Sequence, residues 1–478
     1  MSLLTLYAGL ATSYAKAIQT GAIQPGSRLP SVRELARTHK ISLTTAVKVY
    51  RTLEEDGLVH ARPRSGYFAN LPKKPNSTCL KKQATPSIPE NAQYIGTHTS
   101  VSNFVACRVS SSPWLDLSQA SAAFDLYPAE ALRVHLMRAL RMQPQLFCEA
   151  PPLQGASELR KALASHALKS GAVIAPNQIL ITSGATEAIN LALKAVSTYG
   201  DIIAVESPTF YGLFQILESL GLQALEIPTQ PETGFSVDAL ELALDMGVKV
   251  KAVIVTPILQ NPLGCSTPDI QKKRLLKLCE KYQIALIEDD PYRDLLDATP
   301  PPQSIKSLDK SGLVIYCASL HKILAPGIRL GWITAGRWHS RVEILKYAKS
   351  HNTDGLSQSV VAKFLLSNDY ERHLTRFRSA LHIRISSTLE MIYKHFPKNI
   401  RINKPQGGMQ LWIELPERCS AQLIYEQAAK QGVLIAPGNI FCNNNKYNNF
   451  IRINTSGTCN EKKEKAIQIL GNIILKSL

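Results

Sequence analysis

The sequence predicts an α/β protein with three parts: a small helical module ending in a β-hairpin, a linker, and a large domain built on a mostly parallel sheet. Three observations support this prediction. Apolar residues recur at helical spacing in residues 1–71, a stretch rich in Pro, Ser, Thr and Lys follows, and beyond Trp114 helical segments alternate with short apolar runs. With 478 residues, the chain has room for roughly three compact units.

The composition is that of an ordinary globular protein whose basic residues are concentrated near the N-terminus. Hydrophobic residues make up 45% of the chain and charged residues 19%. Of the net charge of +17, residues 1–71 carry +5 and residues 72–112 carry +4. This distribution favours a polyanionic partner for the N-terminal part, and a solvated basic surface is the alternative explanation.

Cysteine usage and hydropathy predict a cytoplasmic protein. The nine cysteines are scattered and lack the spacing of a disulfide framework or a zinc site, so we expect reduced thiols and no bound metal. No apolar run reaches the ~18 residues that a membrane span requires, and no export signal begins the chain. We therefore expect no membrane partner.

The N-terminal module is predicted to begin with a helix from Leu3 to Ile18. Ser31 then caps a second helix that extends to His39, and Glu34 completes a capping box. After a short turn, Ser42 caps a third helix that ends near Asp56. Two helices joined by so short a turn favour a helix-turn-helix. A hairpin over residues 58–69 follows, so the module as a whole is predicted to be a winged helix-turn-helix.

The segment Pro25-Gly26-Ser27-Arg28-Leu29-Pro30-Ser31-Val32-Arg33-Glu34-Leu35-Ala36 resembles the opening of GntR-type DNA-binding domains, and Ser65-Gly66-Tyr67-Phe68 resembles their wing. In that family the helix after the turn enters the major groove of double-stranded DNA, and the wing touches phosphates or the minor groove. Position 43 is Leu, where many relatives carry a polar or basic residue. The alternative for Thr44 and Thr45 is that they only cap the helix and face solvent. The resemblance implies operator contacts by Arg28, Ser31, Arg33, Thr44, Thr45, Lys48, Arg62 and Arg64.

Residues 72–112 are predicted to be a flexible basic linker, with a short docked helix near Ser102–Arg108, because they show no sustained periodicity. The large domain follows over residues 113–478, with a large part at about 150–335 and a small part at about 336–478. Seven apolar runs predict its strands: 178–182, 202–206, 224–227, 252–256, 284–288, 314–317 and 331–335. Ligands of such sheets bind at the carboxyl ends of the strands.

The run Ser319-Leu320-His321-Lys322 follows one of these strands, and Arg329 comes shortly afterwards. A serine, a lysine and an arginine around one turn are what a pyridoxal phosphate site needs, since the amine forms an imine with the cofactor aldehyde and the other two groups hold its phosphate. After another strand, Ser183-Gly184-Ala185-Thr186-Glu187 opens a helix whose N–H groups can face an anion. Many strand-helix turns contain glycine, so this second motif is weak by itself.

Other strand ends carry residues that could contact the ring of such a cofactor. Asp289 could keep a pyridine nitrogen protonated, with an acidic helix cap as the alternative, and Tyr292 could bond the ring oxygen. Phe210 or Tyr211 could stack on the ring or simply pack in the core. Asn261 presents an amide from a Pro-rich turn, or is only part of that turn. Arg452 lies in an apolar strand, where a cation is costly unless it meets an anion such as a carboxylate.

In their order and spacing these motifs resemble the fold-type I, class I aminotransferases from about residue 114 to the end of the chain. The resemblance implies that Lys322 forms the imine, that Asp289 pairs with the ring nitrogen, and that Arg452 binds a carboxylate. It also implies a stacking role for Phe210, ring-oxygen contacts for Asn261 and Tyr292, and a phosphate cup from Gly184, Ala185, Thr186, Ser319 and Arg329. Relatives often supply a tyrosine to the partner subunit's phosphate, but here residues 147–152 read Phe-Cys-Glu-Ala-Pro-Pro.

Together, the two parts resemble the MocR family of bacterial transcription regulators, in which the large domain binds pyridoxal phosphate as a sensor and the chains form head-to-tail dimers. The resemblance implies a DNA-binding homodimer in which an amine or amino acid replaces Lys322 on the cofactor, converting an internal aldimine to an external one. The carboxylate of the effector would bind Arg452 and shift the small part and the DNA-binding heads. The alternative is a working pyridoxal phosphate-dependent aminotransferase with an appended DNA-binding module.

Overall fold

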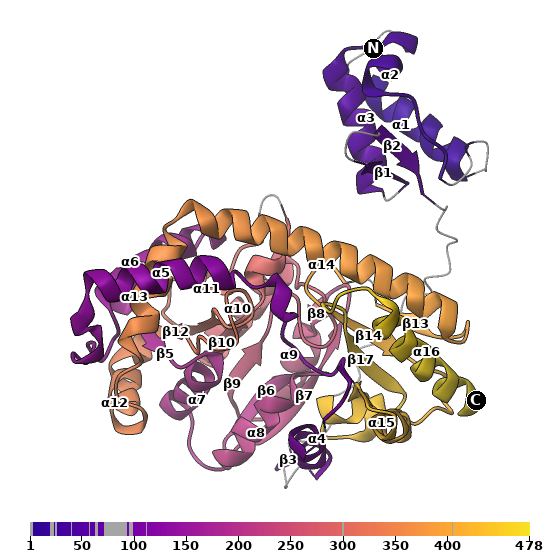
Figure 1. Ribbon diagram of the computed structural model, residues 1–478. Coiled ribbons are helices and arrows are strands. Elements are labelled where there is room, and N and C mark those ends of the chain that lie inside the picture. The colour runs from indigo at the N-terminus through magenta and orange to yellow at the C-terminus, as the bar shows by residue number, and fades with distance from the viewer. Residues whose placement is uncertain are drawn as a thin grey trace. The chain divides into compact units, whose positions relative to one another are not determined.

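The computed structural model describes residues 3–19, 23, 26–39, 41–56, 58–62, 66–70, 93–94, 99–110, 112–298, 301–403 and 405–478 (Figure 1). The chain divides into two compact units, Met1–Ser77 and Thr78–Leu478. The first unit contains the predicted helices and hairpin, and the second contains a large sheet, its helices and a smaller C-terminal sheet. The α/β fold class predicted from the sequence is confirmed.

The first unit is a three-helix module with a β-hairpin. Its elements are α1 (Leu3–Gln19), α2 (Val32–Thr38), α3 (Leu43–Glu55), β1 (Val59–Arg62) and β2 (Gly66–Ala69). The predicted capping box is present, since the Ser31 hydroxyl accepts a hydrogen bond from the N–H of Glu34 and the Glu34 carboxylate accepts one from the N–H of Ser31. Ser42 caps α3 by accepting from the N–H of Thr45. The two strands pair antiparallel, with Val59 opposite Ala69.

Helix α3 supplies most of the core of the first unit. Ala46, Val49, Tyr50 and Leu53 recur at helical spacing, and all four are fully buried. The ring of Tyr50 stacks on that of Tyr67 in β2, with 4.3 Å between the ring centroids. This packing fixes α3 against the hairpin and leaves the opposite face of the helix at the surface.

All seven strands predicted from apolar runs occur in one sheet of the second unit. Nine strands of the described chain belong to this sheet, in the order β3-β7-β6-β9-β10-β11-β12-β5, with β8 paired to β7. From β7 to β11 the strands are parallel, whereas β12 is antiparallel to β11 and β5. Their bounds are β3 (Gln93–Tyr94), β5 (Leu180–Thr182), β6 (Ile202–Ser207), β7 (Gln223–Gln230), β8 (Gly234–Phe235), β9 (Val250–Val255), β10 (Ala285–Asp290), β11 (Val314–Ser319) and β12 (Gly331–Thr334).

Helices cover both faces of this sheet (Figure 1). The helices are α5 (Ala129–Met142), α6 (Ser157–Ala167), α7 (Ala185–Val196), α8 (Tyr211–Ser219), α9 (Val237–Asp245), α10 (Asp269–Tyr282), α11 (Ile305–Leu308), α12 (His339–Lys349) and α13 (Gly355–Leu365). In β11, Val314 belongs to the core shared with α9 and α10, and Ile315 belongs to the core shared with α7 and α8, because successive strand residues face opposite sides. Burial on both faces explains why these strands read as continuous apolar runs.

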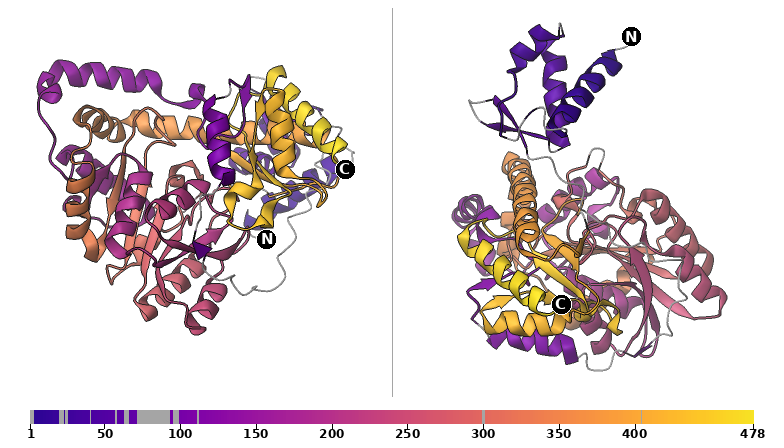
Figure 2. Two further views of the ribbon diagram at one scale, coloured as in Figure 1. Left: turned by 90° about the horizontal axis from the view of Figure 1, so that it is seen from below. Right: turned by 90° about the vertical axis from the view of Figure 1, so that its right-hand side faces the viewer.

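The C-terminal part of the second unit is a four-stranded sheet with its own helices, at one end of the unit in Figure 2. Its strands, in the order β13-β14-β17-β16, are β13 (Arg401–Ile402), β14 (Gln410–Glu414), β17 (Phe450–Asn454) and β16 (Ala436–Pro437). The helices are α14 (Asn368–His395), α15 (Ala421–Lys430) and α16 (Glu461–Lys476). Helix α14 runs from the large sheet to this part (Figure 1). A segment from early in the second unit also packs on this part, because β4 (Leu115–Asp116) pairs in parallel with β15 (Val433–Leu434).

Short 3-10 turns connect several of these elements. They are η1 (Phe124–Leu126), η2 (Pro144–Phe147), η3 (Leu168–Ser170), η4 (Pro176–Gln178), η5 (Arg293–Leu295), η6 (Gly336–Trp338), η7 (Gly438–Phe441) and η8 (Asn445–Tyr447).

The last part of the predicted linker forms helix α4 (Thr99–Ser110), which includes the short helix expected near residues 102–108. Val101 and Phe104 are buried in the core of the C-terminal part. The Phe104 ring lies 5.5 Å from that of Tyr211 at the start of α8 and 5.7 Å from that of Tyr425 in α15. The linker therefore ends as a helix anchored on the second unit. Apart from residues 93–94, residues 71–98 lie outside the described chain.

None of the helices in the described part of the chain combines the length and the apolar character that a membrane crossing needs. The eight cysteines of the described chain are free thiols.

Candidate cofactor and DNA-binding sites

The turn between β5 and the N-terminus of α7 is a candidate anion-binding site. Gly184 caps this 12-residue helix with a positive φ of 93°, and Gly331 of β12 packs directly against it. A Cβ atom at Gly331 would lie 2.6 Å from the Gly184 carbonyl carbon, so only glycine fits there. Arg329 reaches the same turn, where its Nη2 donates to the Ser183 carbonyl oxygen at 3.4 Å. The helix N-terminus and the guanidinium thus provide donors and positive potential for a phosphate.

Of the residues predicted to form this cup, Ser319 is buried at the end of β11, Ala185 is half-buried, and Thr186 and Arg329 are exposed. The Ser319 hydroxyl accepts a hydrogen bond from the N–H of His321 at 3.2 Å, which holds the start of the turn that carries Lys322. The roles of these residues in binding a phosphate stay predictions.

Lys322 is half-buried in the turn after β11, and its Nζ donates to the Ser121 hydroxyl at 3.5 Å. Burial lowers the pKa of Lys322, the Arg452 guanidinium lowers it further, and the Asp289 carboxylate opposes the decrease, which leaves the pKa at about 8. Near pH 8 a large share of the side chain is therefore the neutral amine, which is the form that attacks an aldehyde.

Asp289 lies at the end of β10, opposite Cys317 of β11. Its Oδ1 atom is buried and has no hydrogen-bond partner among the described residues. Burial and the neighbouring Asp290 carboxylate raise the pKa of Asp289, Lys322 opposes the increase, and the resulting pKa is about 7. A buried carboxylate oxygen without a donor is the group that a protonated pyridine nitrogen would satisfy.

Arg452 is fully buried in β17. Its Nη1 donates to Asn261 Oδ1 at 2.8 Å and its Nη2 donates to the Ser118 carbonyl oxygen, while Nε has no partner among the described residues. The guanidinium lies over the Phe441 ring, 5.0 Å from its centroid, and burial lowers its pKa. Both of these hydrogen-bond acceptors are neutral, so this buried cation suits an anionic ligand.

The two candidate stacking rings have different surroundings. Tyr211 packs against Phe104 and against Phe441, with ring centroids 5.5 Å and 5.9 Å away. Phe210, the residue before it, is 38% exposed, and its only described ring neighbour is Tyr211 at 4.8 Å. Phe210 is therefore the ring that remains available for a flat ligand. Tyr292, the predicted ring-oxygen contact, is buried.

Sequence reasoning missed Ser118 and Ser121, which follow β4 and reach the site only through the fold. The Ser121 hydroxyl lies 3.2 Å from Nε2 of His321 and 3.5 Å from Nζ of Lys322. Asn454 holds this loop by donating its amide to the Ser121 carbonyl oxygen at 2.7 Å. No motif marks either serine, because Ser121 contacts a residue 200 positions away in the chain and Ser118 contacts one 334 positions away.

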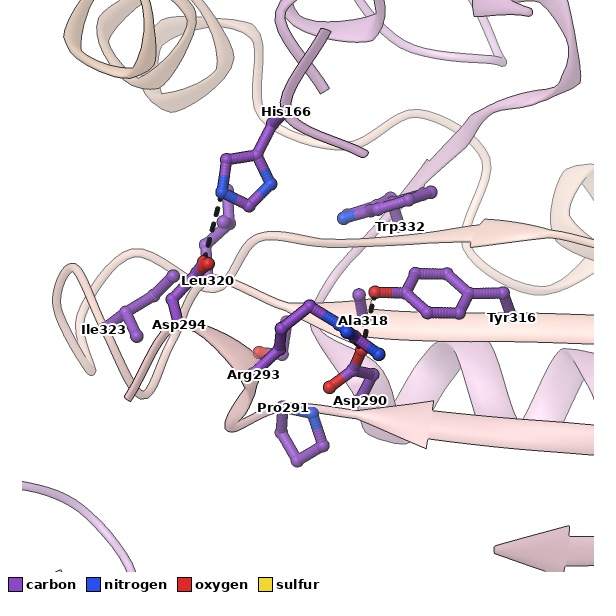
Figure 3. Close-up of a pocket in the computed structure, with 11 residues that line it drawn as sticks. His166, Asp290, Pro291, Arg293, Asp294, Tyr316, Ala318, Leu320, Ile323 and Trp332 are labelled. Atoms are coloured by element: carbon purple, nitrogen blue, oxygen red, sulfur yellow. Dashed lines mark hydrogen bonds and ion pairs between the residues drawn. The ribbon is translucent and has the colours of Figure 1, made fainter. Parts of the chain in front are cut away.

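A small polar cavity adjoins the Lys322 turn (Figure 3). On one side Tyr316 donates to Asp290 at 2.9 Å, and on the other His166 lies 3.2 Å from Asp294, whose pKa is lowered by His166 despite its burial. With a volume of about 20 Å³ the cavity holds roughly one water molecule and no larger ligand. Ser319, Leu320 and Ile323 of the Lys322 turn also line this cavity. The lining residues are His166, Asp290, Pro291, Arg293, Asp294, Tyr316, Ala318, Ser319, Leu320, Ile323 and Trp332.

In the first unit, five of the eight predicted operator contacts are exposed: Arg28, Ser31, Arg33, Thr44 and Lys48. The hydroxyl of Ser31 already caps α2, and the hydroxyl of the half-buried Thr45 lies 2.8 Å from that of Ser42. Ser31 thus serves as a helix cap and the Thr45 hydroxyl contacts the cap residue Ser42, while DNA contacts by these residues stay predictions. The Arg62 side chain and Arg64 lie outside the described residues.

Comparison with known proteins gives a separate family match for each of the two units. Residues 114–470 match the family "aminotransferase class I and II", and residues 6–68 match "bacterial regulatory proteins, gntR family". The chain is 35% identical over 480 residues to YjiR, an uncharacterized HTH-type transcriptional regulator of Escherichia coli, with 99% of this chain and 100% of the relative covered. It is also 30% identical to aromatic-amino-acid aminotransferase 1 of Thermococcus litoralis, over 77% of this chain and 90% of that protein.

Solved structures agree on the fold of the second unit. The kynurenine aminotransferase of Pyrococcus horikoshii superposes with a TM-score of 0.73 at 29% sequence identity, covering 79% of this chain and 94% of that chain.

Proposed function

The chain belongs to the aminotransferase class I and II family and carries a gntR-family domain, the architecture of MocR-type transcriptional regulators, and on this premise we propose that it senses an amine or amino acid through Lys322. The family depends on pyridoxal phosphate, which is the expected cofactor. Because its partner is DNA, we expect the protein to work in the cytoplasm.

The observation that carries this proposal is a set of polar groups that lack protein partners. Asp289 Oδ1 and Arg452 Nε are both buried and unsatisfied among the described residues. Such groups are costly unless a ligand meets them. A cofactor with a cationic ring nitrogen suits the first, and a ligand carboxylate suits the second. The donors around Gly184 and Arg329 suit a phosphate.

Pyridoxal phosphate, when bound, supplies an aldehyde carbon that primary amines capture reversibly. Lys322 would hold this carbon in the resting protein, and an amine effector would displace it. Ser121 would then accept a hydrogen bond from the freed ammonium, as it does at 3.5 Å in the structure. Arg452 would bind the carboxylate of an amino acid effector, which would make the site prefer amino acids to plain amines.

Helix α4 offers a direct connection from this site to the linker. Phe104 of α4 touches Tyr211, which follows the proposed stacking residue Phe210 and also packs on Phe441 beneath Arg452. An effector that moves these rings would change the packing of α4, and the chain leading to the DNA-binding unit begins at that helix. The effector can shift the protein between two states only by the difference between its affinities for them.

We also propose a homodimer, because two winged helices could then read paired half-sites. Support comes from large apolar side chains that are exposed on and around α5. Five of them fall within residues 124–147, and this concentration of exposed apolar side chains favours a subunit contact there. The side chains and their exposed fractions are Phe124 (82%), Val134 (53%), Met137 (53%), Met142 (67%) and Phe147 (72%). Sedimentation of the full chain tests this proposal, and a monomer at micromolar concentration would contradict it.

Lys322→Ala tests the sensing proposal. The wild-type protein loaded with pyridoxal phosphate should show the imine absorbance band, and an amino acid effector should change both this band and the affinity for operator DNA. The variant should lose the band and the effector response while it still binds DNA, because Lys322 belongs to the second unit and not to the winged helix.

Lys277→Ala is the matched control, since Lys277 is an exposed lysine of α10. It should keep the band and the response. The proposal is wrong if the wild type shows no imine band, or if Lys322→Ala regulates transcription like the wild type.

A second candidate function, an active aminotransferase, is favoured by the same complete set of Lys322, Asp289 and Arg452 and by the 30% identity to an aminotransferase. A panel of amino acids assayed for keto acid formation distinguishes the two. Rapid turnover without specific DNA affinity would favour the enzyme, whereas slow or absent turnover with effector-dependent DNA binding would favour the regulator.

A further inference from the structure

The outward face of α3 carries two large apolar side chains. Leu43 is 54% exposed and Val47 is 47% exposed, although the remaining apolar residues of this helix are buried. The two lie four residues apart, so their side chains are neighbours on one face in the first two turns of the helix. Exposing them costs hydration free energy that a polar residue at either position would avoid.

The surroundings of this apolar pair are cationic and polar. Thr44, Lys48 and Arg51 are exposed on the same side of α3, and the first turn of the helix contains no acidic residue. Glu54 lies at the far end of the helix, where its carboxylate accepts a hydrogen bond from the N–H of Ala61 in the hairpin at 3.2 Å. The N-terminal half of the face therefore combines positive charge with two apolar groups, which suits a polyanion that itself presents apolar groups.

Duplex DNA has this character in its major groove, because the C5 methyl of thymine is an apolar group on a base edge there. Leu43 and Val47 can bond neither phosphates nor base heteroatoms, so thymine methyl groups are the partners left to them. We propose that Leu43 and Val47 read thymine methyl groups in the operator. This inference rests on the proposed DNA binding and adds the base that each side chain selects.

The spacing of the pair limits the sequence it can read. Residues four apart on a helix are separated by about 6 Å along its axis, and base pairs follow one another at about 3.4 Å. The two methyl groups should therefore lie on neighbouring base pairs or on pairs one step further apart, on either strand.

The test uses a duplex that the full-length wild-type protein selects from a random library. Each thymine of the selected half-site is replaced singly by deoxyuridine, which removes only the methyl group. At two positions we expect the Kd to rise about fourfold, since burial of one methyl group is worth about 0.8 kcal/mol. With Leu43→Ala one of these positions should become insensitive to the replacement, and with Val47→Ala the other should.

Lys48→Ala is the matched control. It should weaken binding to the thymine and deoxyuridine duplexes equally and reduce the salt dependence, because a lysine that contacts phosphate does not sense the methyl group. All three side chains are exposed, so the thermal stability of the variants should equal that of the wild type.

Two results would overturn the inference while leaving DNA binding intact. One is a selected duplex whose affinity no deoxyuridine replacement changes. The other is a loss of the same size in wild type, Leu43→Ala and Val47→Ala, which would assign the effect to DNA shape. If the wild-type protein enriches no duplex from the library, the proposed function itself fails, and this inference fails with it.

Discussion

Replacing Asp289 by Asn should stabilise the cofactor-free protein and weaken its cofactor binding. Burial and the Asp290 carboxylate raise the pKa of Asp289 from 3.8 to about 7. The folded chain therefore binds this proton more tightly than the unfolded chain, and the stability cost grows as the pH rises from about 4 to about 7. At about 1.4 kcal/mol per pH unit, ionised Asp289 costs the folded state at most about 4 kcal/mol near pH 8. Asn carries no charge and avoids this cost.

With the cofactor bound, wild type should be favoured over Asp289→Asn, because the Asp289 carboxylate then meets a cationic ring nitrogen. Losing a hydrogen bond to a charged group costs about 1.5–3 kcal/mol, so the Kd for pyridoxal phosphate should rise about 10- to 150-fold in Asp289→Asn. Urea unfolding followed by tryptophan fluorescence measures both effects. All four tryptophans, at positions 114, 332, 338 and 412, lie in the second unit and report on its unfolding.

Asp309→Asn is the control of opposite sign. The Asp309 carboxylate accepts hydrogen bonds from Lys306, from the N–H group of Val314 and from the Ser311 hydroxyl, and these partners lower its pKa despite its burial. Its removal should destabilise the protein near pH 8. The reasoning for Asp289 is refuted if cofactor-free Asp289→Asn is less stable than wild type near pH 8, or if its gain in stability does not shrink as the pH falls toward about 4.

Three further substitutions test the site and its connection to the linker. Gly331→Ala should weaken pyridoxal phosphate binding by about 1–3 kcal/mol, because the new Cβ would lie 2.6 Å from the Gly184 carbonyl carbon. Gly327→Ala is the control, since a Cβ at Gly327 would meet no atom within 4 Å, and it should bind the cofactor normally. Calorimetric titration measures both affinities. Arg452→Lys should weaken the effect of an amino acid on DNA binding about 10- to 150-fold and leave the effect of the corresponding decarboxylated amine unchanged. Equal losses for the amino acid and the amine would contradict a carboxylate-binding role. Phe104→Ala should destabilise the second unit by about 3–5 kcal/mol in urea unfolding, because Phe104 is buried. Val105→Ala, on the exposed side of the same helix, should stay within about 0.5 kcal/mol of wild type. Similar losses of stability for both variants would disprove the anchoring of α4.

Elements with a strong local pattern were predicted well from the sequence. The seven apolar runs became β5, β6, β7, β9, β10, β11 and β12, because strands buried on both faces need unbroken apolar segments. The caps at Ser31 and Ser42 were also found, since a cap is decided by residues three positions apart. Strands β3 and β8 were missed, because two residues paired at the edge of a sheet leave no periodic signal.

The sequence by itself determined which chemical groups the protein has and in what order: a winged helix, then Asp289, Lys322 and Arg452 at the ends of strands or within a strand of an aminotransferase-like domain. Tertiary structure decided which of these groups lack a partner. The orphaned oxygen of Asp289, the contact of Ser121 with Lys322 and the docking of Phe104 beside Tyr211 all depend on segments far apart in the chain. Local pattern cannot specify such contacts, because burial and hydrogen bonding are properties of the packed chain and not of neighbouring residues.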